Sequence, residues 1–77
     1  MENNEKVYIQ QFNVSTNSGR KRMKLLESAL AAAGVFYYEE PGNTTSNRAV
    51  YVKVDNLGLA SRVWGKLLAA ERERFRP

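Results

Sequence analysis

Four cations stand close together in the segment SGRKRMKLL, which covers residues 18–26. They are Arg20, Lys21, Arg22 and Lys24, and they stand where helical periodicity begins. The N-terminus of a helix carries partial positive charge, so each cation there costs about 0.3–1 kcal/mol. A bound phosphate would gain from these charges and from the free helical N–H groups. The cluster is therefore either a phosphate-binding surface or a solvated helix face that tolerates a small cost.

Tyrosine side chains are the second candidate for binding chemistry. Tyr8 and Tyr51 each occupy a segment whose side chains alternate as in a β-strand. An aromatic ring on an open sheet gives any nucleobase a surface for stacking, worth about 1–3 kcal/mol per base. The same two rings could instead pack together as a cross-strand pair or be buried in a dimer.

Catalytic chemistry has little support in the composition. The chain has no cysteine and no histidine, which excludes disulfides, thiolate nucleophiles, zinc sites built on these residues and imidazole catalysis. Glu39 and Glu40 are adjacent, but neighbours on a strand point to opposite faces. No serine, threonine or lysine has a recognisable activating partner. We therefore expect a protein that is not an enzyme and that holds no metal or cofactor.

Length and charge describe a small basic domain. With 77 residues, the chain is expected to form one α+β domain over residues 1–77. Its net charge is +4, to which residues 15–38 and 56–77 each contribute +3 and the remainder −2. Clustered positive charge is typical of a polyanion-binding surface, although a solvated surface has the same composition. The lack of cysteine fits a cytoplasmic protein, and no apolar run is long enough to span a membrane.

Periodicity predicts a first strand over residues 6–14 and a helix over residues 20–33. Alternation in the strand places Val7, Ile9 and Gln11 on the face toward the helices, and Tyr8, Gln10 and Phe12 on the opposite face. The apolar stripe of the helix consists of Met23, Leu26, Ala29, Leu30 and Ala33. Gly34 fits the position that ends a helix in a left-handed conformation.

Two further strands, over residues 35–40 and 49–54, and a helix from Leu57 to about Phe75 complete the expected elements. The third strand places Val50, Val52 and Val54 toward the helices, and Ala49, Tyr51 and Lys53 away from them. The stripe of the second helix consists of Ala60, Val63, Trp64, Leu67, Leu68 and Phe75. The order β-α-β-β-α predicts a single-layer three-stranded antiparallel sheet with two helices on one face, and an uncovered opposite face.

Two strand segments have the form of known motifs. Residues 7–12, VYIQQF, are similar to the shorter ribonucleoprotein motif of the RNA recognition motif family, and residues 47–54, NRAVYVKV, resemble its longer motif. The resemblance implies a ferredoxin-like fold and places Tyr8 and Tyr51 where that family stacks aromatics on bases. The departures from the longer motif are Asn47 for a basic residue, Arg48 for glycine and Ala49 for a second aromatic. The family's fourth strand is also missing.

These observations favour a small basic module that binds RNA or single-stranded DNA. The residues expected to bind it are Tyr8, Gln10, Arg20, Lys21, Lys24, Arg48, Tyr51 and Lys53. The alternative is a protein-binding regulator or inhibitor, of the kind encoded by phages and mobile elements, that docks on an acidic partner protein. The incomplete ribonucleoprotein motif favours this alternative, whereas the interleaving of Tyr8, Tyr51 and Lys53 favours nucleic acid.

A homodimer is expected to form through the first strand. Without a fourth strand, residues 6–14 form a free edge with β-forming side chains, no proline and only Lys6 as a guarding charge. Long unguarded edges are usually paired or covered. Antiparallel pairing about a two-fold axis would join two three-stranded sheets into one.

Overall fold

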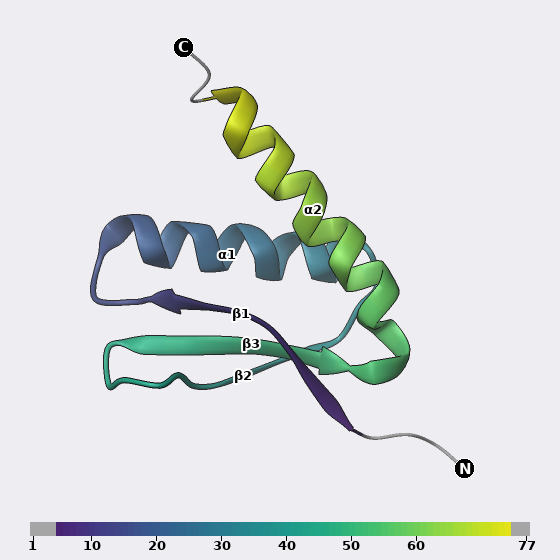
Figure 1. The fold of residues 1–77 in the computed structure, drawn as a ribbon, viewed down its shortest axis with the longest axis horizontal. Helices are drawn as coiled ribbons and strands as arrows, with labels where there is room; N and C mark the ends of the chain where they lie inside the picture. The colour runs from purple at the N-terminus through teal and green to yellow at the C-terminus, as the bar shows by residue number, and fades with distance from the viewer. Residues whose placement is uncertain (1–4, 75–77) are drawn as a thin grey trace.

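A computed structural model of the protein describes residues 5–74 (Figure 1). The elements are β1 (Lys6–Asn13), α1 (Asn17–Ala32), β2 (Tyr37–Pro41), β3 (Asn47–Lys53) and α2 (Leu57–Arg74), with a 3-10 turn (Val54–Asn56) before α2. The sheet is antiparallel and its strand order is β1-β3-β2. The predicted α+β class is therefore confirmed, and the strand order is compatible with a ferredoxin-like arrangement.

The two ends of α1 are set by residues outside its apolar stripe. Thr16 has an extended backbone, and its hydroxyl accepts a hydrogen bond of 3.0 Å from the N–H of Gly19. This N-cap starts the helix at Asn17, three residues before the predicted start, because it satisfies an otherwise unpaired donor of the first turn. After the helix, Gly34 has a φ of 76°, as predicted for the residue that follows a helix C-terminus.

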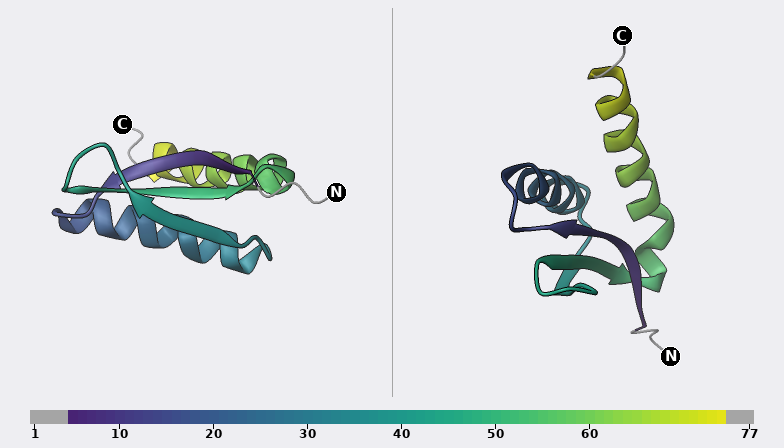
Figure 2. Two further views of the ribbon diagram at one scale, coloured as in Figure 1. Left: turned by 90° about the horizontal axis from the view of Figure 1, so that it is seen from below. Right: turned by 60° about the vertical axis from the view of Figure 1, so that its left-hand side comes forward.

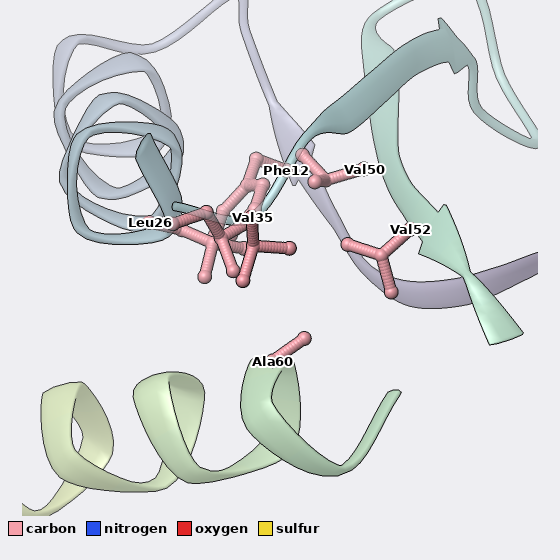
Figure 3. Packing of buried hydrophobic residues seen from close by; sticks show 7 residues of the cluster. Phe12, Leu26, Val35, Val50, Val52 and Ala60 are labelled. Carbon is pink, nitrogen blue, oxygen red and sulfur yellow. The ribbon is translucent and has the colours of Figure 1, made fainter. Parts of the chain in front are cut away.

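The hydrophobic core lies between one face of the sheet and both helices (Figure 3). Val50 and Val52 of β3 are fully buried, as their alternation predicted. They belong to one cluster with Leu26 and Leu30 of α1 and with Ala60 of α2. Both helices therefore cover the same face of the sheet, and no other described element covers the opposite, open face.

A β-bulge interrupts the alternation of β1. Tyr8 pairs with Tyr51, but the next pair joins Gln10 to Val50 and leaves Ile9 without a direct partner. Ile9 is therefore an extra residue in β1, and its side chain packs against the core. An extra residue shifts the register by one position, so every side chain after it moves to the other face.

Three predictions for β1 are wrong because of this bulge. Gln10 was expected on the open face, but it pairs with the buried Val50 and so stands at a register position on the side of the helices. Phe12 was expected on the open face, but its side chain is only 4% exposed and belongs to the core. Its ring meets Trp64 of α2 edge to face, with centroids 5.7 Å apart. Gln11 was expected to face the helices, but it pairs with Ala49 and lines a hollow on the open face.

β2 begins two residues later than predicted, because Val35 is tied to the end of α1. The N–H of Val35 donates to the carbonyl of Leu30 at 2.9 Å, and its side chain is buried in the core. Phe36 follows with 68% of its surface exposed. Of the next two side chains, Tyr37 packs against the core and Tyr38 lies opposite Tyr51 on the open face.

α2 starts against the sheet and then projects away from it (Figures 1 and 2). Its stripe packs against the core through Val63, Trp64 and Leu67, as predicted. Phe75, which was expected to end that stripe, lies outside the described residues. Arg22 of α1 joins the two helices: its guanidinium lies 6.0 Å from the Trp64 ring centroid and 3.3 Å from the carboxylate of Glu71. None of the described helices has the length and apolar character that a membrane crossing requires.

β1 is an edge strand beside β3, as predicted, and its free edge is partly capped. Just past the ends of the two strands, the N–H of Val14 donates to the carbonyl of Ser46. Because successive N–H groups of a strand point in opposite directions, the N–H of Gln11, three residues earlier, points away from β3. The side-chain oxygen of Gln10 accepts a 3.0 Å hydrogen bond from that N–H and one of 3.1 Å from the Tyr8 hydroxyl. The bulge and this cap both make the edge less regular. Pairing of two β1 strands in a homodimer stays a prediction.

Substituting the aromatic residues of β1 tests the bulge. We expect Phe12→Ala to lower the free energy of unfolding by about 3–5 kcal/mol, because it empties a buried site. Tyr8→Ala is the matched control on the same strand, and we expect it to cost about 0.5–1.5 kcal/mol, the worth of an aromatic pair. Urea unfolding followed by circular dichroism measures both. Equal costs for the two variants would contradict the shifted register.

Candidate nucleic-acid interface

A row of aromatic side chains crosses the open face of the sheet from one edge to the other. Tyr8, Tyr51 and Tyr38 lie directly opposite one another on β1, β3 and β2. The rings of Tyr8 and Tyr51 meet at 78° with centroids 5.9 Å apart, and Phe36 meets Tyr38 at 70° and 5.1 Å. Tyr8 keeps 47% of its surface exposed, so the row remains accessible to a ligand although the rings pack together.

Lys6 spans this aromatic row. Its ammonium lies 4.8 Å from the ring centroid of Tyr38 and 3.3 Å from the carboxylate of Glu40 on the far edge strand. Both members of the ion pair are partly exposed, and such pairs contribute at most about 1 kcal/mol. A phosphate can therefore compete with Glu40 for Lys6. Lys53, which lies opposite Lys6 in the register, is the second cation of this face.

A hollow of about 340 Å³ lies alongside the row, on the side toward the turn that joins β2 to β3. It is lined by Tyr8, Gln11, Pro41, Gly42, Asn43, Ala49 and Tyr51. Ala49, whose side chain is only 2% exposed, lies between the two tyrosines and the turn that joins β2 to β3. The position where the RNA recognition motif carries a second aromatic thus holds a small side chain that its neighbours cover.

The turn is held over the sheet by Gln11. The N–H of Asn43 donates to the Gln11 side-chain oxygen at 3.2 Å, and the N–H of Gly42 donates to the Asn47 carbonyl at 2.8 Å. Gly42 is required for this approach, because a Cβ there would lie 2.7 Å from the Gln11 oxygen and 2.6 Å from the Asn47 Cβ. Sequence reasoning missed Gln11 and Gly42, because strict alternation directed Gln11 toward the helices.

The predicted site residues do not form one site. Tyr8, Tyr51 and Lys53 lie on the open face. Gln10 pairs with the buried Val50 and does not share that face; its side-chain oxygen lies along the outer edge of β1, where it accepts from the Tyr8 hydroxyl and the Gln11 N–H. The three predicted cations of α1, Arg20, Lys21 and Lys24, are exposed on that helix, which covers the opposite face of the sheet from the tyrosines. The first turn of α1 and the β2–β3 turn nevertheless lie at the same end of the molecule (Figure 1).

Among the three predicted cations of α1, Arg20 has a structural role. Its guanidinium donates to the Val14 carbonyl at 2.7 Å and also to the side-chain oxygen of Asn17. These bonds fix the connection between β1 and α1. Lys21 and Lys24 are exposed and line a shallow depression with Arg20. They are therefore the better candidates for contacts with a polyanion.

Arg48 faces the helices and is engaged in a carboxylate cluster. Its Nε donates to Glu39 at 3.2 Å. Burial of the Glu27 side chain on α1 raises its pKa to about 7, and the neighbouring Glu39 carboxyl adds to this through a hydrogen bond and repulsion, while Arg48 and Lys24 oppose it. One Glu27 oxygen is buried and has no hydrogen-bond partner among the described residues. Glu39 and Glu40 point to opposite faces, as predicted, so Glu39 interacts with Glu27 instead.

Comparison of the chain with protein-family models, curated proteins and solved structures found no match. The resemblance to the RNA recognition motif therefore stays a prediction. Within the part of the chain that the structure describes, no group of three or more acidic, histidine or cysteine side chains could hold a metal ion.

The carboxylate cluster of Glu27 and Glu39 makes the free energy of unfolding depend on pH. We expect the free energy of unfolding to fall as pH rises from about 4.5, the ordinary pKa, to about 7, because folded Glu27 binds its proton more tightly than the unfolded chain does. Glu27→Gln keeps a hydrogen-bond donor toward Glu39 at every pH. We expect it to flatten this dependence and to stabilise the protein at pH 8 by on the order of 1 kcal/mol.

Urea unfolding at pH 5 and pH 8 checks this expectation. Glu40→Gln, which removes an exposed carboxylate from the same strand as Glu39, is the control and should retain the wild-type slope. A Glu27→Gln variant with an unchanged slope would contradict the role of Glu27.

Proposed function

We propose that the protein binds single-stranded nucleic acid, RNA or DNA, on the open face of its sheet. The observation that carries the proposal is the row of Tyr8, Tyr51 and Tyr38 on that face, in which Tyr8 is 47% exposed. Phe36, which is 68% exposed, adjoins the row through its ring contact with Tyr38. Monomeric proteins rarely leave several neighbouring aromatic rings in water without a partner. Every nucleobase has a π-face, so such a row can bind single strands with little sequence preference.

The distribution of charge is compatible with this ligand. Lys6 and Lys53 lie on the open face, where they can neutralise phosphates between stacked bases. Lys21 and Lys24 lie on the other side of the sheet, but at the end of the molecule where the β2–β3 turn closes the hollow (Figure 1). A nucleic-acid strand that leaves the open face at this end can bring further phosphates to α1. Each such contact releases counterions and makes affinity depend on salt.

Docking on an acidic partner protein is the second candidate function. It is favoured by the separation between the cations of α1 and the aromatic row, since one short nucleic-acid strand cannot contact both without bending around the sheet. Phe36 also suits a protein interface, because interfaces are enriched in exposed aromatic residues. In this function the aromatic row would bury itself against a partner, and nucleic acid would bind weakly or not at all.

Substituting the two central tyrosines tests stacking. We expect Tyr8→Ala and Tyr51→Ala each to weaken the binding of a labelled octauridylate by about 1–3 kcal/mol, because each removes a stacking surface. Leu25→Ala removes an exposed apolar side chain from α1 and is the control; it should bind as the wild type does. Fluorescence anisotropy measures affinity, and circular dichroism verifies folding. Folded tyrosine variants with wild-type affinity would exclude stacking.

Removing charge from α1 tests whether a bound nucleic-acid strand reaches this helix. We expect Lys21→Gln with Lys24→Gln to lower affinity for a 16-nucleotide strand of any sequence. The slope of log K against log salt should become shallower by about 1.4, which is about 0.7 for each lost phosphate contact. The control is Arg62→Gln with Lys66→Gln, an equal charge change at exposed positions of α2. Equal slopes for the two double variants would mean that the strand does not reach α1.

A further inference from the structure

We propose that Lys6 makes the open face selective for ligands that carry phosphate, because its side chain covers Tyr38 until a phosphate replaces Glu40 as its partner. The inference rests on the proposed function, since it assigns a specificity-determining residue within the same aromatic row. It goes beyond stacking in general, because it states which ligands with the same rings the row accepts and which it disfavours.

The Lys6 side chain crosses the sheet from one edge strand to the other. Lys6 belongs to β1, whereas its two partners, Tyr38 and Glu40, belong to β2 on the far side of β3. The ammonium lies over the Tyr38 ring, 4.8 Å from its centroid, and 3.3 Å from a carboxylate oxygen of Glu40. Lys6 therefore occupies a ring face that the row would otherwise offer to a base. We call this side chain with its two contacts the Lys6 strap.

Both contacts of the Lys6 strap are weak enough to be exchanged. The side chains of Lys6 and Glu40 are 43% and 41% exposed, so water screens their attraction. An exposed ion pair and an exposed cation–π contact are each worth no more than about fivefold in an equilibrium constant. A phosphate can therefore take the place of Glu40 beside Lys6, and a base can then take the place of the ammonium on the Tyr38 ring.

The Lys6 strap makes the row selective because ligands differ in what they offer Lys6 in return. A ligand with phosphates gives the ammonium a new charged hydrogen-bond partner, which offsets the two contacts that it loses. An uncharged ligand must displace the ammonium from Tyr38 without such compensation. The row therefore favours a nucleic-acid strand over an uncharged aromatic surface, such as an apolar patch on a protein.

Removing the ammonium distinguishes the Lys6 strap from a general effect of charge. The alanine of Lys6→Ala is too short to reach β2, so this variant uncovers Tyr38 but also deletes a partner for phosphate. Two probes separate these effects: octathymidylate, and its methylphosphonate analogue, which carries the same bases on an uncharged backbone. Lys21→Ala removes the same charge from an exposed position of α1 and is the matched control.

Fluorescence anisotropy of the labelled strands, with protein up to millimolar concentration at fixed low salt, measures the affinities. We expect Lys6→Ala to raise the affinity for the uncharged strand by about two- to fivefold, because a base no longer has to displace the ammonium. We expect the same variant to lower the affinity for octathymidylate, which loses a phosphate contact. Lys21→Ala should leave the affinity for the uncharged strand unchanged. Circular dichroism confirms that each variant is folded.

The outcomes separate the Lys6 strap from the proposed function. If the wild type binds octathymidylate but the uncharged strand binds Lys6→Ala no better than the wild type, or binds neither protein, the strap is wrong while binding by the open face stands. A gain for the uncharged strand that Lys21→Ala shares overturns the strap in the same way. If the wild type does not bind octathymidylate at low salt, the strap is wrong, and if it does not bind octauridylate either, the proposed function is wrong as well.

Discussion

The extra residue in β1 is the constraint on which the remaining structure depends. Because Ile9 has no direct partner, Tyr8 stays beside Tyr51 on the open face while Phe12 turns into the core. Phe12 then gives Trp64 a ring to pack on, and this contact helps to hold α2 against the sheet. Without the bulge, a phenylalanine would lie in water, and the core of a small domain would lose one of its largest side chains.

The same shift creates the hollow. It brings Gln11 to the open face, where its oxygen holds the β2–β3 turn through the N–H of Asn43. The missing Cβ of Gly42 lets the turn approach Gln11 and Asn47 closely, and the turn and the strands together line the hollow. Structure and proposed function are thus linked through one register change: it completes the core on one face and shapes a ligand-sized depression on the other.

Much of the fold could be predicted from the sequence, because strong local patterns determine it. The alternating valines of β3 and the apolar stripes of the two helices require a sheet covered on one face, and the left-handed Gly34 marks the end of α1. The bulge could not be predicted, because Ile9 and Gln10 are compatible with regular alternation and only packing of Phe12 decides against it. The faces of the candidate residues were therefore predicted in part: Tyr8 and Tyr51 share the open face, whereas Gln10 and Gln11 were each assigned to the wrong side.

The central claim is that the open face of the sheet, rather than the outer surface of α1, is the primary binding surface. Titration of ¹⁵N-labelled protein with octauridylate, followed by two-dimensional NMR, tests it most directly. We expect the largest shift changes at the amides of Tyr8, Gln11, Asn43 and Tyr51 and at the Gln11 side-chain amide, with little change at Ser28 on the outer surface of α1. Changes confined to α1, or no changes at millimolar oligonucleotide, would contradict the claim.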